Sequence, residues 1–302
     1  MTAAERDELL PWLDAAVTFP NGMVDRIVPA TTDAYRAAAA RHLGVLDAIP
    51  VPAEPFTMWV LEDRFAAGRP AWEHGGAIFT DDVQPYELLK LRLLNGTHSL
   101  IAYLGALDGR GTIPEAGAQP FVADAARRVL HEDFLPSVTV PADVDLDGYV
   151  AQLFERWANT ALGHRTQQVG SDGSVKLGQR VPEPALLQLR AGRMPHQLAL
   201  TVAAYLCCLA PPAGFDPGPH ADAMVDPARA GLVAARTRSR STAEFAAMVL
   251  DDGLLGRELA DHSAFAGRVA ELIDVIVAYG PAAAATDAAR AADADTSPLL
   301  TL

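Results

Sequence analysis

The sequence is poor in cysteine and lacks a long hydrophobic segment. Only two of its 302 residues are cysteine. Cys207 and Cys208 are adjacent inside an apolar run, so we interpret them as core residues and not as a disulfide framework. That run, at 197–210, is shorter than the roughly 20 residues that cross a bilayer. We therefore expect a cytoplasmic protein with no membrane partner.

Positive charge is also scarce. The formal net charge is −14 at neutral pH, and such a protein repels phosphate backbones and anionic lipid surfaces. We expect no nucleic-acid partner, although a local group of arginines can still bind a small anion. Half of the residues are hydrophobic, which is enough for a substantial core.

Lysine is almost absent. The two lysines, Lys90 and Lys176, each lie in a segment dense with polar residues, and the other basic side chains are mainly arginine. Arginine does not lose its proton in proteins, whereas lysine can, and lysine is also a compact point charge. We predict that Lys90 transfers a proton and that Lys176 holds a substrate anion. The alternative is chance placement of two rare residues.

Helical periodicity dominates the chain, and we predict a mainly α fold with at most minor strand content. Strand character is confined to 56–62, and no strand is followed by G-x-G-x-x-G and a helix. The sequence thus predicts that this chain contains no dinucleotide-binding half. The expected helices are 5–17, 33–44 with Thr31 or Thr32 as N-cap and Gly44 as stop, 84–107, 119–130, 144–162, 184–189, 195–209, 226–235, 242–250 and 262–279.

The first chemical motif lies in 84–107. Along a helix, Glu87, Lys90, Asn95 and His98 fall within an arc of roughly 140°, and most intervening residues are leucine. Burial of the Lys90 amine among leucines would disfavour its charged form, so that it could accept a proton from an alcohol. Asn95 offers amide donors to a developing oxyanion, His98 can hold a neighbouring hydroxyl, and Gly96 would let a ligand approach the backbone. The alternative is an exposed helix face with a Glu87–Lys90 ion pair.

The second motif is the segment HRTQQVGSDGSVKLGQR at 164–180. Its DGS sequence is typical of a turn. His164, Arg165, Lys176 and Arg180 place positive charge in an otherwise acidic chain, which indicates an anion-binding site. The alternative is a surface loop with dispersed cations.

Three segments resemble the long-chain mannitol dehydrogenase family: TFPNGMVDRIVPATT at 18–32, EDRFAAGRPAWE at 62–73 and KLRLLNGTHSLIAYLG at 90–105. The resemblance implies a helical fold like the C-terminal domain of 6-phosphogluconate dehydrogenase. It also implies an inter-domain remnant at 1–30 and a helical substrate domain at 31–280. The low-complexity sequence of Ala, Asp and Thr at 281–302 predicts a frayed or disordered tail.

The resemblance also implies roles for individual residues. Lys90 would correspond to the general base, and Asn95 to an amide that stabilises the oxyanion. The remaining assignments are His98 as a substrate ligand, Asp25 as a further substrate-site residue and Glu87 as part of a proton path.

The second motif resembles one branch of the family. Where mannitol 2-dehydrogenases have an arginine eight residues before the lysine of DGSxK, this chain has Gln168. The segment is more similar to the fructuronate reductase (D-mannonate oxidoreductase) branch, whose substrates carry a carboxylate. The implied reaction interconverts a secondary alcohol and a ketone on a sugar acid. The alternatives are a mannitol 2-dehydrogenase or other polyol dehydrogenase, and a truncated non-catalytic sugar-acid binding or assembly module.

The implied cofactor is NAD or NADP. Because no glycine-rich strand–helix motif occurs, we expect the Rossmann half to be absent from this chain. We expect the isolated chain to bind NAD poorly unless that half is supplied by a separate Rossmann-domain chain or by an upstream start. We predict no metal. The segment at 143–155 imitates a calcium loop but has Phe154 where a bidentate glutamate is needed, so its aspartates are expected to form an acidic N-terminal cluster for the next helix.

Overall fold

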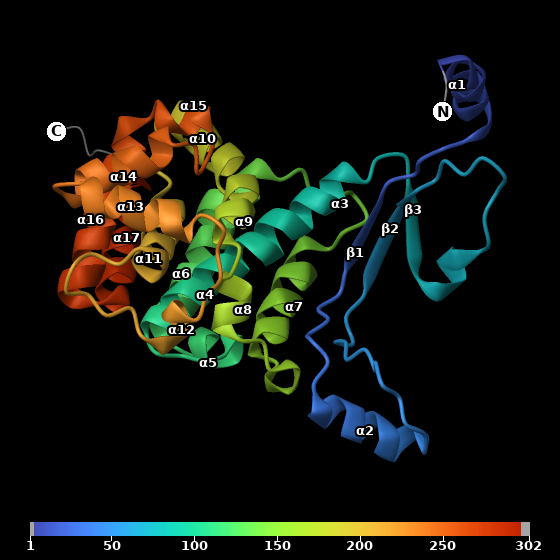
Figure 1. Cartoon of the computed structure of the whole chain (residues 1–302), viewed down its shortest axis with the longest axis horizontal. Coiled ribbons are helices and arrows are strands. Elements are labelled where there is room, and N and C mark those ends of the chain that lie inside the picture. Colours follow the sequence, from blue (N-terminus) through green and yellow to red (C-terminus); the bar gives the residue numbers. More distant parts are fainter. Residues whose placement is uncertain (1–2, 297–302) are drawn as a thin grey trace. The chain divides into compact units, whose positions relative to one another are not determined.

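The computed structural model describes residues 3–296 (Figure 1). These residues form two compact units. Of the described residues, 3–90 and 139–143 form unit 1, and 91–138 and 144–296 form unit 2. The three-part division expected from the sequence differs from this grouping and remains a prediction.

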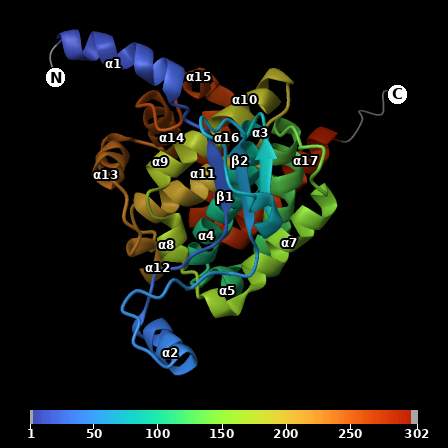
Figure 2. The same ribbon diagram turned by 90° about the vertical axis from the view of Figure 1, so that its right-hand side faces the viewer.

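Unit 1 is built on a three-stranded sheet of order β1-β2-β3. β1 is antiparallel to β2 and β3 is parallel to it, so β2 lies in the middle, as Figures 1 and 2 show. Its elements are α1 (Ala3–Ala16), β1 (Gly22–Asp25), α2 (Asp33–Leu43), β2 (Met58–Glu62), the 3-10 helix η1 (Trp72–Gly75), β3 (Ala77–Thr80) and α3 (Gln84–Leu89).

Local signals in the sequence correctly placed β2 and α2. Thr32 accepts a hydrogen bond from the Tyr35 backbone N–H, and Gly44 adopts a left-handed conformation with φ 71°, as expected for helix caps. β1 and β3 were missed because each has only four residues, too few for a clear alternating pattern. Pairing with β2 defines them: Gly22 lies opposite Leu61, where an added Cβ would be 3.1 Å from the Leu61 side chain.

Unit 2 is a helical assembly around α11, in which every residue is buried. α11 packs against α4, α16 and α17, which confirms the mainly α prediction. The elements are the π-helix η2 (Lys90–Gly96, whose first residue belongs to unit 1), α4 (Thr97–Leu107), α5 (Ile113–Gly117), α6 (Pro120–Arg128), the π-helix η3 (Val129–Phe134), η4 (Leu135–Ser137), α7 (Leu146–Ala158), η5 (Thr160–Leu162), α8 (Thr166–Gly170), α9 (Gly173–Arg180), α10 (Pro182–Arg190), α11 (His196–Leu209), α12 (Pro219–Asp222), α13 (Arg229–Arg238), α14 (Thr242–Asp251), α15 (Arg257–Ala260), α16 (Ser263–Tyr279) and α17 (Pro281–Thr296).

The region predicted as one helix at 84–107 consists of α3, η2 and α4. A π-helix carries i→i+5 hydrogen bonds and often marks a functional site. The angular spacing assumed for a regular α-helix therefore does not hold between Lys90 and Gly96. We expected Gly96 to let a ligand approach the backbone, and this is wrong. The Phe134 ring already occupies that space, 2.4 Å from the position of an added Cβ.

The expectation of a disordered tail is wrong for residues 281–296, which form α17. Alanine has the highest helix propensity, and the small side chains of Ala284 and Ala288 are fully buried. Acidic residues also fix the helix, since Asp293 pairs with Arg128, and Asp287 pairs with Arg268. Residues 297–302 lie outside the described part of the chain.

The aspartate-rich segment before α7 acts as a helix N-terminus, as predicted. Asp145 accepts a hydrogen bond from the Gly148 backbone N–H at 3.2 Å, the usual role of an N-cap carboxylate. Within residues 3–296, no group of three or more His, Cys, Asp or Glu side chains could hold a metal ion. The helices in that same range are all too short or too polar to cross a membrane.

Asp133 lies on the π-helix η3, and its buried carboxyl group contacts the start of α11. It is 4% exposed and accepts a hydrogen bond from the Leu198 backbone N–H at 2.8 Å. Burial raises the pKa of Asp133 to about 7, and the negative charge of Glu132 adds to the shift, while the bond from Leu198 opposes it. The folded protein thus holds this proton more tightly than the unfolded chain, so ionisation of Asp133 destabilises the fold.

We predict that Asp133→Asn removes this dependence on pH. In the wild type, stability is expected to fall as pH rises from about 4 to about 7, by up to ~1.4 kcal/mol per pH unit. Asparagine keeps an acceptor for Leu198 but does not ionise, so the free energy of unfolding of the variant should change less between pH 5 and pH 8. Urea unfolding at both pH values measures this. An equal effect of the substitution at both values would contradict the prediction, and Asp145→Asn in the exposed N-cap is the control.

Candidate functional site

The residues that the sequence singled out are divided between the two units. Asp25, Glu87 and Lys90 belong to unit 1, whereas Asn95, His98, His164, Arg165, Lys176 and Arg180 belong to unit 2.

In unit 1 the amine of Lys90 lies against the β1 strand. Its Nζ donates a hydrogen bond to the Val24 carbonyl oxygen at 2.5 Å, and the next residue, Asp25, is fully buried. Lys90 is half-buried, and Glu87 on α3 is exposed. Within residues 3–296, no ion pair joins Glu87 to Lys90. The amine bonds to the Val24 carbonyl instead, at an exposed position.

In unit 2, Arg180 joins α9 to the π-helical segment. Its Nη1 donates to the Asn95 carbonyl oxygen at 2.9 Å and to Ser99 Oγ at 2.7 Å. The His98 ring lies one turn away on α4, with centroid distances of 5.8 Å to the His164 ring and 6.5 Å to the Trp157 ring. The two motifs, far apart in the sequence, thus meet in one cluster.

Lys176 lies on α9, and its side chain reaches the end of α8. Its Nζ donates to the Val169 carbonyl at 3.1 Å and to the Ser171 carbonyl at 2.6 Å. An ammonium group has three N–H donors, so one donor is left after these two bonds. The side chain is half-buried, which strengthens its field.

The electrostatics of the cluster show an excess of positive charge. Burial lowers the pKa of Arg180 to about 10. Burial, followed by repulsion from Arg180, lowers the pKa of Lys176. Burial also lowers the pKa of His98 well below its ordinary value, and the charges of His164 and Arg180 add to this effect. At neutral pH the cluster therefore combines a neutral His98 with two cations that repel each other, an arrangement that a bound anion would stabilise.

Arg165 is not drawn into this cluster. It is exposed at the start of α8, and its backbone forms an isolated bridge with Thr112. Its assignment to substrate binding remains a prediction.

Sequence reasoning missed two buried residues of the cluster. Ser99 is fully buried and accepts the bond from Arg180, and Arg156 on α7 is buried and adds to the lowering of the His98 pKa. The position of Ser99 one residue after His98 in the motif was the available signal. No such signal marked Arg156, because nothing in the local sequence indicates which helix α7 packs against.

The DGS segment is held by two tyrosines. The Tyr103 and Tyr205 rings pack edge to face with centroids 5.4 Å apart, and Tyr103 Oη donates to the Gly170 carbonyl at 3.2 Å. An added Cβ at Gly173 would lie 2.4 Å from Tyr103 Oη and 2.4 Å from the Tyr205 ring. The absence of a side chain at Gly173 is what lets α9, and with it Lys176 and Arg180, pack this closely.

We predict that Gly173→Ala lowers the free energy of unfolding by about 1–3 kcal/mol, because the added methyl group must displace one of the two rings. Chemical denaturation measures the loss. The matched control is Gly231→Ala in α13, where nothing lies within 4 Å of the added Cβ, and which should stabilise by about 0.4–1 kcal/mol. If both variants behave alike, close packing does not explain the glycine.

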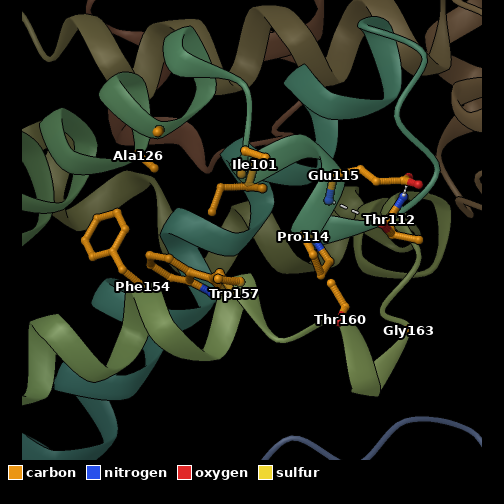
Figure 3. Close-up of a pocket in the computed structure, with 13 residues that line it drawn as sticks. Ile101, Thr112, Pro114, Glu115, Ala126, Phe154, Trp157, Thr160 and Gly163 are labelled. Carbon is orange, nitrogen blue, oxygen red and sulfur yellow. Dashed lines mark hydrogen bonds between the residues drawn. The ribbon is translucent and has the colours of Figure 1, made fainter.

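A separate cavity of approximately 580 Å³ lies among α4, α5, α6, α7 and η5. In Figure 3, the rings of Phe154 and Trp157 lie on one side of it, across from Ile101 and Ala126, with the Thr112–Glu115 hydrogen bonds at the far end. Its walls are mainly apolar and include no residue predicted from the sequence. Trp157 lines this cavity, and its ring centroid lies 6.5 Å from that of His98. Of the residues that line the cavity, only Glu115 is ionisable, so the cavity lacks the cations that the polar cluster contains.

The chain is similar to known proteins in sequence and in fold. Residues 82–277 match the family model "Mannitol dehydrogenase C-terminal domain" and residues 1–74 match "Mannitol dehydrogenase Rossmann domain". The chain is 38% identical to D-mannonate oxidoreductase of Escherichia coli over 89% of this chain and 55% of that protein. It is also similar to the Pseudomonas fluorescens mannitol 2-dehydrogenase solved with NAD and D-mannitol, with 32% identity and a TM-score of 0.78 over 95% of this chain and 57% of that one. The chain thus spans little more than half the length of these relatives.

The Rossmann match corrects one expectation. We expected the Rossmann half to be absent, but a model of that domain matches residues 1–74. That expectation depended on the absence of one glycine-rich motif. The matched segment contains β1 and β2, of which only β2 has a recognisable pattern in the sequence. The inference of poor NAD binding, which depended on this absence, falls with it.

Proposed function

The chain belongs to the mannitol dehydrogenase family, and we propose that it serves an NAD(P)-dependent oxidoreductase that interconverts a secondary alcohol and a ketone on a sugar acid. The observation that carries the sugar-acid assignment is the cluster in unit 2, where Arg180 and Lys176 are partly or largely buried. Burial lowers the pKa of both groups, and the charge of Arg180 lowers the pKa of Lys176 further. A substrate carboxylate between them would relieve this repulsion.

Lys90 is the proposed proton acceptor. In its neutral form the amine takes the proton from the substrate hydroxyl, and as ammonium it returns the proton to the oxygen in the reverse reaction. Its bond to the Val24 carbonyl holds the amine in place through the backbone and not through a carboxylate. The exposed Glu87, one turn earlier, is the proposed group for proton exchange with solvent.

Asn95 and His98 are the proposed partners of the substrate oxygens. The Asn95 amide donates to the oxygen on which negative charge develops. His98 is neutral because burial lowers its pKa, so its ring offers one donor and one acceptor to a sugar hydroxyl. Asp25, buried beside Val24 in β1, and His164, beside His98, are proposed as further substrate-site residues. Arg165 is proposed as an outer cation.

NAD or NADP is the proposed hydride acceptor, held by the Rossmann-matched residues 1–74. The fit is supported by one feature of unit 1: the Lys90 amine contacts β1, which is part of that same matched segment. The bound cofactor would supply hydride transfer to and from the carbon that carries the substrate hydroxyl. Participation of a separate Rossmann-domain chain remains a prediction.

A neutral polyol is the second candidate substrate. It is supported by similarity to the P. fluorescens mannitol 2-dehydrogenase bound to D-mannitol. The third hypothesis, a non-catalytic binding module, has no support, because the relatives compared are named as oxidoreductases or dehydrogenases.

We predict that Lys90→Arg and Lys90→Ala both lower kcat by about 10²–10⁴, the usual contribution of a general acid–base group. Arginine keeps the positive charge but does not release its proton, so charge alone should not restore activity. The assay follows NAD(P)-linked oxidation of D-mannonate. Retention of wild-type kcat by Lys90→Arg would exclude proton transfer by this residue.

Lys176 is expected to respond differently. Lys176→Gln should raise the KM for D-mannonate at least tenfold while changing that for D-mannitol much less, because the lost group binds a carboxylate. Lys176→Arg keeps a cation and should retain most of the affinity for D-mannonate. Equal effects on the acid and the polyol would favour the polyol dehydrogenase alternative. Steady-state kinetics with each substrate measure these KM values.

A further inference from the structure

Arg180 has more N–H donors than its hydrogen bonds within the protein use. Both Nη1 protons are used, in the bonds to the Asn95 carbonyl and to Ser99 Oγ. Nε is buried and, in the described part of the chain, has no hydrogen-bond partner. A buried donor without a partner costs about 1–3 kcal/mol, so the protein retains it at the expense of stability.

The geometry of the guanidinium group decides which of its edges remains available to a ligand. The group is planar and carries five N–H donors in fixed directions. When both protons of Nη1 are bound, the remaining donors are those of Nε and Nη2, which lie along one edge. That edge matches the two oxygens of a carboxylate. Across residues 3–296 the structure gives Nη2 no hydrogen-bond partner either.

Ser99 controls which edge is left. It is fully buried in α4; its Oγ accepts the bond from Arg180 at 2.7 Å and lies 3.4 Å from the Asn95 carbonyl oxygen, to which it donates. The hydroxyl, the carbonyl and Nη1 therefore form a closed triangle. Without the hydroxyl, one Nη1 proton would lose its acceptor and the guanidinium could rotate toward another arrangement.

The surrounding charges favour an anion at the free edge. Lys176 has one donor left and lies close enough to Arg180 for repulsion between them to lower its proton affinity. The acidic groups that act on Lys176 are Asp172 and Asp226. Asp226 already accepts bonds from the Ser174 N–H, the Tyr205 hydroxyl and the Ala228 N–H, so it is engaged in holding α9 in place.

We propose that Ser99 is a positioning residue: together with the Asn95 carbonyl it fixes Nη1 of Arg180 and thereby leaves the Nε–Nη2 edge for the carboxylate of a sugar acid. The proposal rests on the proposed function for the identity of the substrate. It adds that recognition of the acid group is linked mechanically to the π-helical segment carrying Asn95, because the same guanidinium bonds to both.

The test is calorimetric binding of D-mannonate and of D-mannitol to the whole chain, with and without NAD. Ser99→Ala should weaken binding of D-mannonate at least tenfold and that of D-mannitol less than threefold, since only the acid uses the Arg180 edge. The matched control is Thr201→Val, which removes another buried hydroxyl bonded to the carbonyl four residues earlier, that of Gln197, without touching Arg180. It should leave both affinities unchanged.

A double-mutant cycle tests whether Ser99 acts through Arg180. Arg180→Lys keeps the charge but loses the planar edge, and in that background Ser99→Ala should have little further effect on D-mannonate binding. Additive effects would overturn the positioning role. If Ser99→Ala unfolds, as judged by circular dichroism, Ser99→Cys carries the test, because its thiol is a weak acceptor of similar size.

The outcomes separate this inference from the proposed function. Binding of D-mannonate that depends on Ser99 and Arg180, without NAD-linked turnover of any sugar acid or polyol, would overturn the proposed reaction and uphold the positioning role. NAD-linked turnover by the wild type, together with a Ser99→Ala variant that binds D-mannonate and D-mannitol equally weakly, would uphold the proposed reaction and overturn the positioning role. Failure of the wild-type chain to bind D-mannonate, with or without NAD, would overturn the inference.

Discussion

The bond pair from Arg180 Nη1 to the Asn95 carbonyl and Ser99 Oγ is the interaction on which the candidate site depends. It joins the end of α9 to the junction of η2 and α4, segments separated by about eighty residues. Arginine suits this position because its donors are fixed in one plane. Lysine could supply the charge but could not hold a carbonyl with one nitrogen and offer a second edge to a ligand.

Close packing makes this bond pair possible. Gly170 and Gly173 leave room for the side chains around Tyr103 and Tyr205, and Asp226 bonds to the backbone at Ser174 and to the Tyr205 hydroxyl. The start of α9 is therefore fixed by apolar rings and by a buried carboxylate together. Rigid support of this kind keeps polar groups oriented in a site where water cannot compensate for misplacement.

Conflicting demands on stability recur in unit 2. The cations of the cluster repel each other, Arg180 Nε has no partner in the described residues, and Asp133 is buried with a raised pKa. Each costs free energy that the apolar core around α11 must offset. The unpartnered donor and the repelling cations share one place with the two motifs found in the sequence, as expected where binding is favoured over stability. Asp133 lies elsewhere, on η3, where its carboxyl group contacts the start of α11.

The sequence by itself determined the mainly α architecture, the caps of α2, the strand β2 and the two polar motifs, because these depend on periodicity and on residues close together in the chain. It did not determine β1 and β3, the π-helix at Lys90–Gly96 or the helical structure of residues 281–296. Only the tertiary structure decided that Ser99 and Asn95 meet Arg180, and that Lys90 bonds to Val24. Those contacts join distant parts of the chain, and no local pattern specifies which donor will find which acceptor once the helices and strands pack.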